Sequence, residues 1–165
     1  MPVAIPLGLP YDGGRDCSAA AARYLGTKNP LREWCLMTEL DERSPKILVI
    51  DDDFANRRVL RLVLTRNGYA ALLAGDGYEG LRMAKEARPD LILLDFFMPG
   101  EDGFEVLAQL KADPELRGIP VVIFTVLVRE ESQRQALEMG AAAYVTKPFD
   151  IGEVITCIRR ILPQP

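Results

Sequence analysis

The sequence predicts an α/β protein in which helices cover both faces of a five-stranded parallel sheet. From residue 46 onward, short apolar runs alternate regularly with segments of helical periodicity. Two of the runs, residues 47–50 and 91–94, are apolar at every position, which is typical of strands buried on both faces of a parallel sheet. Polar side chains follow four of the runs directly, at the strand ends where open α/β sheets bind ligands.

The elements follow one another in a clear order. Turn and capping signals separate them, such as Asn67-Gly68 after the first helix and aspartates followed three residues later by glutamate at Asp76 and Asp150. Since right-handed crossovers join parallel strands, five such units favour the flavodoxin-like strand order 2-1-3-4-5 in a doubly wound sheet. We expect strands at residues 47–50, 69–74, 91–94, 119–124 and 142–145, and helices at 54–66, 76–87, 102–111, 129–139 and 150–161.

Apolar stripes indicate which faces of the first and last helices are buried. The spacing of these positions is that of one side of an α-helix. In the first helix the stripe comprises Val59, Leu60, Val63 and Leu64, and in the last helix it comprises Ile151, Val154, Ile155, Ile158 and Leu162.

Residues 1–44 differ from the rest of the chain. Proline and glycine cluster at their start, and the two short helix-compatible pieces that follow lack the apolar periodicity for a core of their own. We therefore expect an N-terminal extension, poorly ordered or weakly helical, before a domain at 45–165. Residues 1–36 are then either dispensable for folding or a docking segment anchored by Leu31 and Trp34.

Composition excludes several classes of function. The net charge of −4 over 165 residues gives no electrostatic reason to bind nucleic acid or an anionic membrane, and no apolar run is long enough to span a bilayer. The three cysteines are unpatterned, as in reduced cytoplasmic proteins, so we expect a cytoplasmic protein. The absence of histidine excludes histidine-based zinc sites and catalytic triads within the chain.

Four polar groups are expected to converge at one edge of the sheet. They follow the first, third, fourth and fifth strands, which are neighbours in the predicted order. Crowded carboxylates repel each other unless a cation joins them, and oxygen ligands without histidine or cysteine select Mg²⁺. A lysine and a hydroxyl beside the ion can bind a phosphoryl group, which leaves one carboxylate for in-line attack. The groups are Asp51-Asp52-Asp53, Asp95, Thr125 and Lys147, with Asp95 as the attacking carboxylate.

At these residues the sequence resembles the receiver domain of two-component response regulators, of the stand-alone, single-domain type. The resemblance rests on the motifs ILVIDDD, LILLDFFMPGEDGFEVL, IPVVIFT and AAAYVTKPF. It implies that Asp95 is the phosphoacceptor and also a Mg²⁺ ligand. It also implies that Asp52 binds the ion directly, that Asp51 contributes indirectly, and that the backbone carbonyl of Phe97 completes the protein ligands.

The resemblance assigns roles to three further residues. Thr125 and Tyr144 match the switch pair, and Lys147 matches the phosphate-binding lysine, whose bond to Pro148 the family makes cis. There are also departures at apolar positions near the phosphoryl site. These are Val126, where the family usually has alanine or glycine, and Phe97 and Leu127, where polar groups often influence the attacking water.

The implied function is a signalling switch and not an enzyme with a separate substrate. A sensor histidine kinase or phosphotransfer protein would donate the phosphoryl group from a phosphohistidine to Asp95, and the domain would catalyse this transfer and its own slow dephosphorylation. With no segment after the last helix, we expect output through a partner protein on the face formed by the fourth helix, fifth strand and fifth helix.

Two alternatives stay open at this point. One is a phosphoaspartyl hydrolase of the haloacid dehalogenase type, in which Asp51 and Asp53 would form the D-x-D signature and Asp95 would have no role. The other is a receiver-like module that signals without phosphate.

Overall fold

The computed structural model describes residues 44–98, 101–126, 129–148 and 150–162. Its main sheet has five parallel strands in the order β2-β1-β3-β6-β7, which along the chain is the predicted order 2-1-3-4-5. The strands are β1 (Lys46–Ile50), β2 (Ala70–Ala74), β3 (Leu91–Leu94), β6 (Val121–Thr125) and β7 (Ala143–Thr146). The helices are α3 (Phe54–Arg66), α4 (Gly77–Ala87), α5 (Gly103–Ala112), α6 (Glu130–Glu138) and α7 (Ile151–Ile161).

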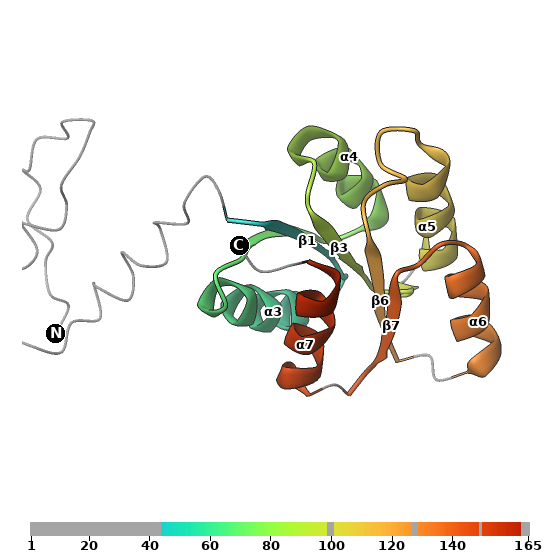
Figure 1. The fold of residues 1–165 in the computed structure, drawn as a ribbon. Coiled ribbons are helices and arrows are strands. Elements are labelled where there is room, and N and C mark those ends of the chain that lie inside the picture. Colours follow the sequence, from blue (N-terminus) through green and yellow to red (C-terminus); the bar gives the residue numbers. More distant parts are fainter. Residues whose placement is uncertain (1–43, 99–100, 127–128, 149, 163–165) are drawn as a thin grey trace, which may run out of the picture. The chain divides into compact units, whose positions relative to one another are not determined.

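The helices form a layer on each face of this sheet. Figure 1 shows α3 and α7 on one face and α4, α5 and α6 on the other. Side chains of β1 alternate between the two layers, because successive residues of a strand point to opposite faces. Leu48 and Ile50 pack in the cluster with α4 and α5, whereas Ile47 and Val49 pack in the cluster with α3 and α7. All four are at most 1% exposed, which explains the continuous apolar run in the sequence.

Two residues of the predicted apolar stripes are not buried. Val59 is 46% exposed and Ile151 is 49% exposed, so the expectation that they face the core is wrong. Val59 lies about 100° around α3 from the buried Leu60, which turns it to the flank of the helix. Ile151 is the first residue of α7 and lies ahead of the buried stripe, which begins at Val154.

Aspartate side chains cap four of the five helices in the described part of the chain: Asp53, Asp76, Asp102 and Asp150. A carboxylate here accepts hydrogen bonds from the first free N–H groups of the helix and favours its positive end. At α4 the predicted capping box forms only in part. Asp76 accepts from the Glu79 N–H at 2.7 Å, but the Glu79 carboxylate accepts from the Gly75 N–H instead.

The loop after β3 contains an antiparallel ribbon that the sequence analysis did not predict. Its strands are β4 (Phe97–Met98) and β5 (Glu101–Asp102). The ribbon leads directly into α5, whose first residue, Gly103, is buried against the backbone that follows β3. Gly103 therefore fixes how the start of α5 approaches Asp95.

No helix among the described residues is long and apolar enough to cross a membrane. The N-terminal extension, with Leu31 and Trp34, lies outside the described residues, so the domain boundary stays a prediction.

Replacing Gly103 with alanine should destabilise the domain. A methyl group there would lie 2.9 Å from the Asp95 carbonyl oxygen and closer still to the Phe96 backbone, neither of which is a flexible chain end. We expect a loss of about 1–3 kcal/mol in the free energy of unfolding, measured by urea titration. Gly118→Ala is the matched control, because a methyl group at that exposed glycine meets nothing within 4 Å. The control should stay within about 0.5 kcal/mol of the parent. Equal stability of both variants would contradict the close packing at Gly103.

Candidate functional site

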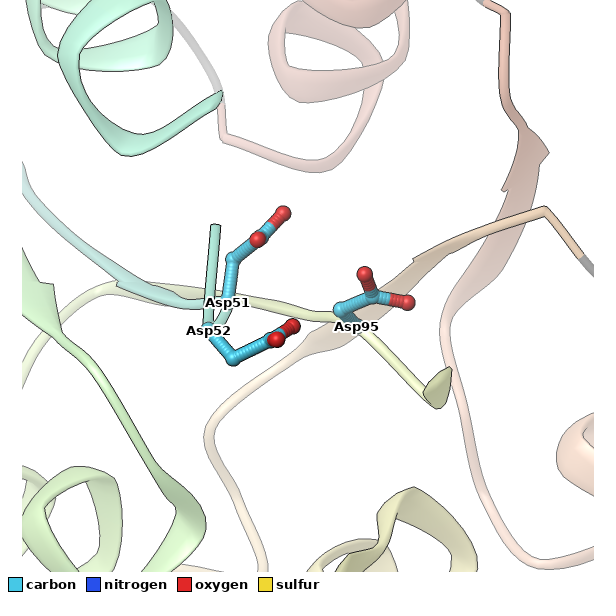
Figure 2. Close-up of side chains that lie close together, drawn as sticks. All are labelled: Asp51, Asp52 and Asp95. Carbon is cyan, nitrogen blue, oxygen red and sulfur yellow. The ribbon is translucent and has the colours of Figure 1, made fainter. Parts of the chain in front are cut away.

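Three carboxylates meet at the carboxyl end of the sheet. Asp51 and Asp52 follow β1, and Asp95 follows β3, which is paired with β1 in parallel. One oxygen from each lies within 4.8 Å of the others, and Figure 2 shows the three side chains gathered around one space. Asp51 and Asp95 are 1% and 5% exposed, while Asp52 is exposed. The strand order thus brings together acidic residues that are more than 40 positions apart in the sequence.

Lys147, which follows β7, joins two of these carboxylates. Its Nζ donates to Asp51 Oδ2 at 2.7 Å and to Asp95 Oδ2 at 2.6 Å, and its side chain is only 10% exposed. Burial alone would lower the pKa of Lys147, but the hydrogen bonds and negative charges of Asp51 and Asp95 outweigh it, so the pKa is raised. The lysine is therefore a fixed positive charge at neutral pH. The Lys147-Pro148 bond is cis, as the resemblance implies.

Asp51 is held in place by several donors. Its Oδ1 accepts from the Asp53 N–H at 2.8 Å, and its Oδ2 accepts from the Asn56 side-chain amide at 3.3 Å as well as from Lys147. The Arg57 guanidinium donates to the backbone carbonyl of Asp51. Sequence reasoning missed Asn56 and Arg57, although both are polar residues in the first turns of the helix that follows the acidic run. Together they fix the position of the whole Asp51 residue.

Asp52 and Asp53 have different surroundings despite being adjacent. The Asp53 carboxylate caps α3 and accepts from the N–H groups of Ala55 at 2.7 Å and Asn56 at 3.4 Å. Within the described residues, no donor is hydrogen-bonded to the Asp52 carboxylate. Asp53 is thus committed to capping α3, and Asp52 keeps its oxygens available for a cation.

The two carboxylate oxygens of Asp95 accept hydrogen bonds from different donors. The Phe97 N–H donates to Asp95 Oδ1 at 2.9 Å, and Lys147 takes Oδ2. The Phe97 ring points largely to solvent and is 63% exposed. The proposal that the Phe97 carbonyl binds a metal stays a prediction.

The two residues of the expected switch pair lie on the two strands next to β3 on one side, β6 and β7. Thr125 ends β6 and is fully buried, and Tyr144 lies in β7, in register with Ile123. The Tyr144 ring packs edge-on against Phe96, with centroids 6.4 Å apart. Burial first, and then the negative charge of Asp95, raise the pKa of Tyr144. The role of Tyr144 as a switch stays a prediction.

The apolar positions expected to border the site are described only in part. Val126 follows Thr125 and is 51% exposed. Leu127 lies outside the described residues. An exposed Phe97 and an exposed Val126 place apolar side chains on the two loops that follow β3 and β6.

Comparison with known proteins identifies the class. Residues 47–159 match the response regulator receiver domain, so the chain belongs to this family of two-component signalling domains. The chain is 49% identical over 107 residues to response regulator PleD of Caulobacter vibrioides, covering 65% of this chain and 24% of PleD. It is 36% identical over 118 residues to sporulation initiation phosphotransferase F of Bacillus subtilis, covering 72% of this chain and 94% of that protein.

Other relatives carry further segments. The DNA-binding dual master transcriptional regulator RpaA of Synechocystis is 39% identical over 118 residues, which are 72% of this chain and 49% of RpaA. The chain therefore spans about a quarter of the length of PleD and about half of the length of RpaA.

Solved structures agree with the fold. The chemotaxis protein CheY4 of Vibrio cholerae superposes with a TM-score of 0.69 at 28% identity, over 72% of this chain and 99% of CheY4. The receiver domain of the Francisella response regulator 1452 gives a TM-score of 0.67 at 32% identity, over 72% of this chain and 96% of that chain. The expected fold and family are thus confirmed.

The donor set of the site fits a hard divalent cation. Receiver domains bind Mg²⁺ at an acidic pocket, and here three carboxylates with no histidine or cysteine form such a pocket. Lys147 neutralises part of their charge, and the exposed Asp52 faces the space left open.

Removing Asp52 should weaken Mg²⁺ binding far more than removing Asp53. Asp52→Ala deletes an uncommitted carboxylate from the pocket, and we expect the dissociation constant for Mg²⁺, measured by calorimetric titration, to rise about tenfold or more. Asp53→Ala should instead lower the free energy of unfolding by about 1 kcal/mol, because it removes the cap of α3. Equal losses of Mg²⁺ affinity in the two variants would contradict this ranking.

Proposed function

We propose that this domain accepts a phosphoryl group on Asp95 in a Mg²⁺-dependent reaction. The donor is the phosphohistidine of a sensor histidine kinase or of a phosphotransfer protein. The observation that carries the proposal is the position of Asp95, which shares Lys147 with Asp51 and lies in one carboxylate cluster with Asp52. A carboxylate with a fixed cation on one side and an acidic metal pocket on the other is suited to receive a phosphoryl group, which is dianionic once it is attached.

In the transfer, an Asp95 carboxylate oxygen attacks phosphorus as the bond from phosphorus to the donor imidazole nitrogen breaks. The imidazole leaves with its electron pair, and an acyl phosphate forms on Asp95. Lys147 pairs with the phosphoryl oxygens, and the Thr125 hydroxyl donates to one of them. Mg²⁺, held by Asp52, Asp95 and the Phe97 carbonyl with indirect help from Asp51, would neutralise charge on the phosphoryl group.

Phosphorylation would then act through the neighbouring strands. Thr125 and Tyr144 lie on β6 and β7, which lead into α6 and α7. We propose that the hydroxyl of Thr125 moves to the phosphoryl group, that the Tyr144 ring turns inward, and that the face of α6, β7 and α7 binds an output protein. In α6 only Ala136 is buried among the described side chains, which supports a helix that can shift with little loss of packing.

The output is proposed to be a protein contact and not a nucleic-acid contact by this domain. RpaA is named as DNA-binding, but the chain spans only about half of it, and the net charge of −4 opposes binding to a polyanion.

The hydrolase alternative fits the geometry less well. It requires Asp51 as the nucleophile, but Asp51 is 1% exposed and its carboxylate accepts hydrogen bonds from three donors. Asp53, its partner in the D-x-D signature, is committed to capping α3. The hydrolase alternative assigns no role to Asp95, whereas membership of the receiver family supports a role for it as the phosphoacceptor.

Asp95→Asn should abolish phosphorylation, because an amide is not a nucleophile. With Mg²⁺ and acetyl phosphate the parent protein should gain one phosphoryl group per chain, detected by intact mass spectrometry and by its lability to hydroxylamine. Asp53→Asn is the matched control, since it makes the same change on a carboxylate that caps α3, and it should label normally. Full labelling of Asp95→Asn would overturn the assignment, and labelling lost only in an Asp51→Asn variant would favour the hydrolase reading.

The acyl phosphate should be long-lived. Hydrolysis needs a water in line with phosphorus, and neither Phe97 nor Val126 can hydrogen-bond one there, although positioning the nucleophile is a large part of phosphoryl-transfer catalysis. Phe97→Asn and Leu127→Glu should each speed loss of phosphate. The combined effect should be about tenfold, or about 1.4 kcal/mol in activation free energy.

The measurement is phosphate loss in Mg²⁺ buffer after the donor is removed. The exposed Tyr78→Asn on α4 is a control for replacing an exposed aromatic residue elsewhere, and it should leave the lifetime unchanged. If the variants with polar groups lose phosphate no faster than the parent, apolar exclusion of water is wrong.

A further inference from the structure

A buried aromatic ring lies beneath the ammonium group of Lys147. The Lys147 Nζ is 4.9 Å from the centroid of the Phe124 ring and lies over its face. This is within the distance of about 6 Å at which the negative face of an aromatic ring attracts a cation. Phe124 is 1% exposed and is among the largest fully buried side chains of the domain.

The surroundings of the ring make this contact stronger than one at a surface. Phe124 belongs to the hydrophobic cluster that includes Leu60 and Val63 of α3 and Ile155 of α7. The Lys147 side chain is itself only 10% exposed, so little water separates the two groups. Cation–π attraction increases when both partners are desolvated.

The hydrogen bonds of Lys147 explain why the ring matters. An ammonium group has three donors, and Asp51 and Asp95 accept two hydrogen bonds from this one. The aromatic face lies against the same charge from inside the core. The ammonium is therefore held between two carboxylates and a ring, with its long, flexible stem fixed at the charged end.

We propose that Phe124 is a positioning residue for the phosphoryl-transfer site, acting through Lys147. The ring holds the ammonium beside the Asp95 carboxylate, so that Lys147 can pass from the carboxylate oxygen to the phosphoryl oxygens without leaving the site. This inference rests on the proposed function. The amino-acid sequence does not indicate this role, because Phe124 lies in an apolar run that is fully explained by burial in a strand.

The contact leaves a direct spectroscopic signature. Protons over an aromatic face are shifted upfield by the ring current, so the ε-methylene protons of Lys147 should resonate upfield of those of other lysines. We expect this shift in the full-length, unphosphorylated protein and expect it to disappear in Phe124→Leu. Comparison with Lys147→Ala assigns the signal.

The kinetic test varies the charge on the ring face at nearly constant shape. Phe124 is replaced by phenylalanine carrying one, three or five ring fluorines, which progressively remove and then reverse the negative charge of the face. The initial rate of labelling by acetyl phosphate should fall with each step. For pentafluorophenylalanine and for Phe124→Leu the fall should be about tenfold, or about 1.4 kcal/mol in activation free energy.

Leu60→Ala separates positioning from loss of stability. Leu60 is 1% exposed in the same cluster and is not one of the site side chains, so it should lower the urea midpoint but leave the labelling rate of the folded protein unchanged. A graded fall along the fluorine series together with an unchanged rate in Leu60→Ala supports the proposal. Equal rates along the series, or a similar fall in Leu60→Ala, would overturn it.

The two proposals fail in different ways. If the parent protein is not labelled at all, the proposed function is wrong, and the ring-current shift alone decides the position of Lys147. A parent that is labelled, but whose Lys147 signals show no upfield shift, overturns the role of Phe124 and leaves the proposed function standing.

Discussion

The shared ammonium of Lys147 is the interaction on which the site depends. Asp51 and Asp95 are nearly fully buried, and with Asp52 they place three carboxylates within 4.8 Å. Charges this close would favour protonation or push the loops apart unless cations lie among them. Lys147 supplies one such cation from β7, two strands away from β3, at 2.6 and 2.7 Å from the two carboxylates. The strand order therefore matters for electrostatics as well as for packing, because it brings Lys147 to the two buried carboxylates.

The scaffold holds these groups in place because its strands are fixed from both faces. Because these strands are packed on both faces, the residues at their ends, such as Asp95 and Thr125, are held in position by the core. The acidic pair after β1 is held not only by the sheet but also by α3. Its cap, Asp53, and its next polar residues, Asn56 and Arg57, bind the backbone and side chains of the acidic run. The helix start and the site are thus a single hydrogen-bonded unit.

The features that could be predicted from the sequence are those marked by regular apolar periodicity or by charged residues directly after a strand. Strand order, helix ends and the meeting of Asp51, Asp95 and Lys147 follow from apolar runs and from the rule that parallel strands end at one edge. The two-residue strands β4 and β5 carry no period to detect, so the ribbon was missed. The roles of Asn56 and Arg57 depend on which way a helix turns toward the site, and the exposure of Val59 depends on a rotation of about 100° that a four-residue stripe does not resolve.

Helices α3 and α6 differ in how firmly they are packed, which bears on the proposed switch. Helix α3 buries Leu60, Val63 and Leu64 and is tied to the site, whereas α6 buries only Ala136 among its described side chains and has no side-chain cap. In the proposed function, an acyl phosphate on Asp95 would draw Lys147 from the carboxylate oxygen to the phosphoryl oxygens and would also use donors at the ends of β6 and β7. In the chain, α6 lies between these two strands, and among the described helices it has the fewest buried side chains. We therefore expect a change of charge at Asp95 to move α6 more readily than α3.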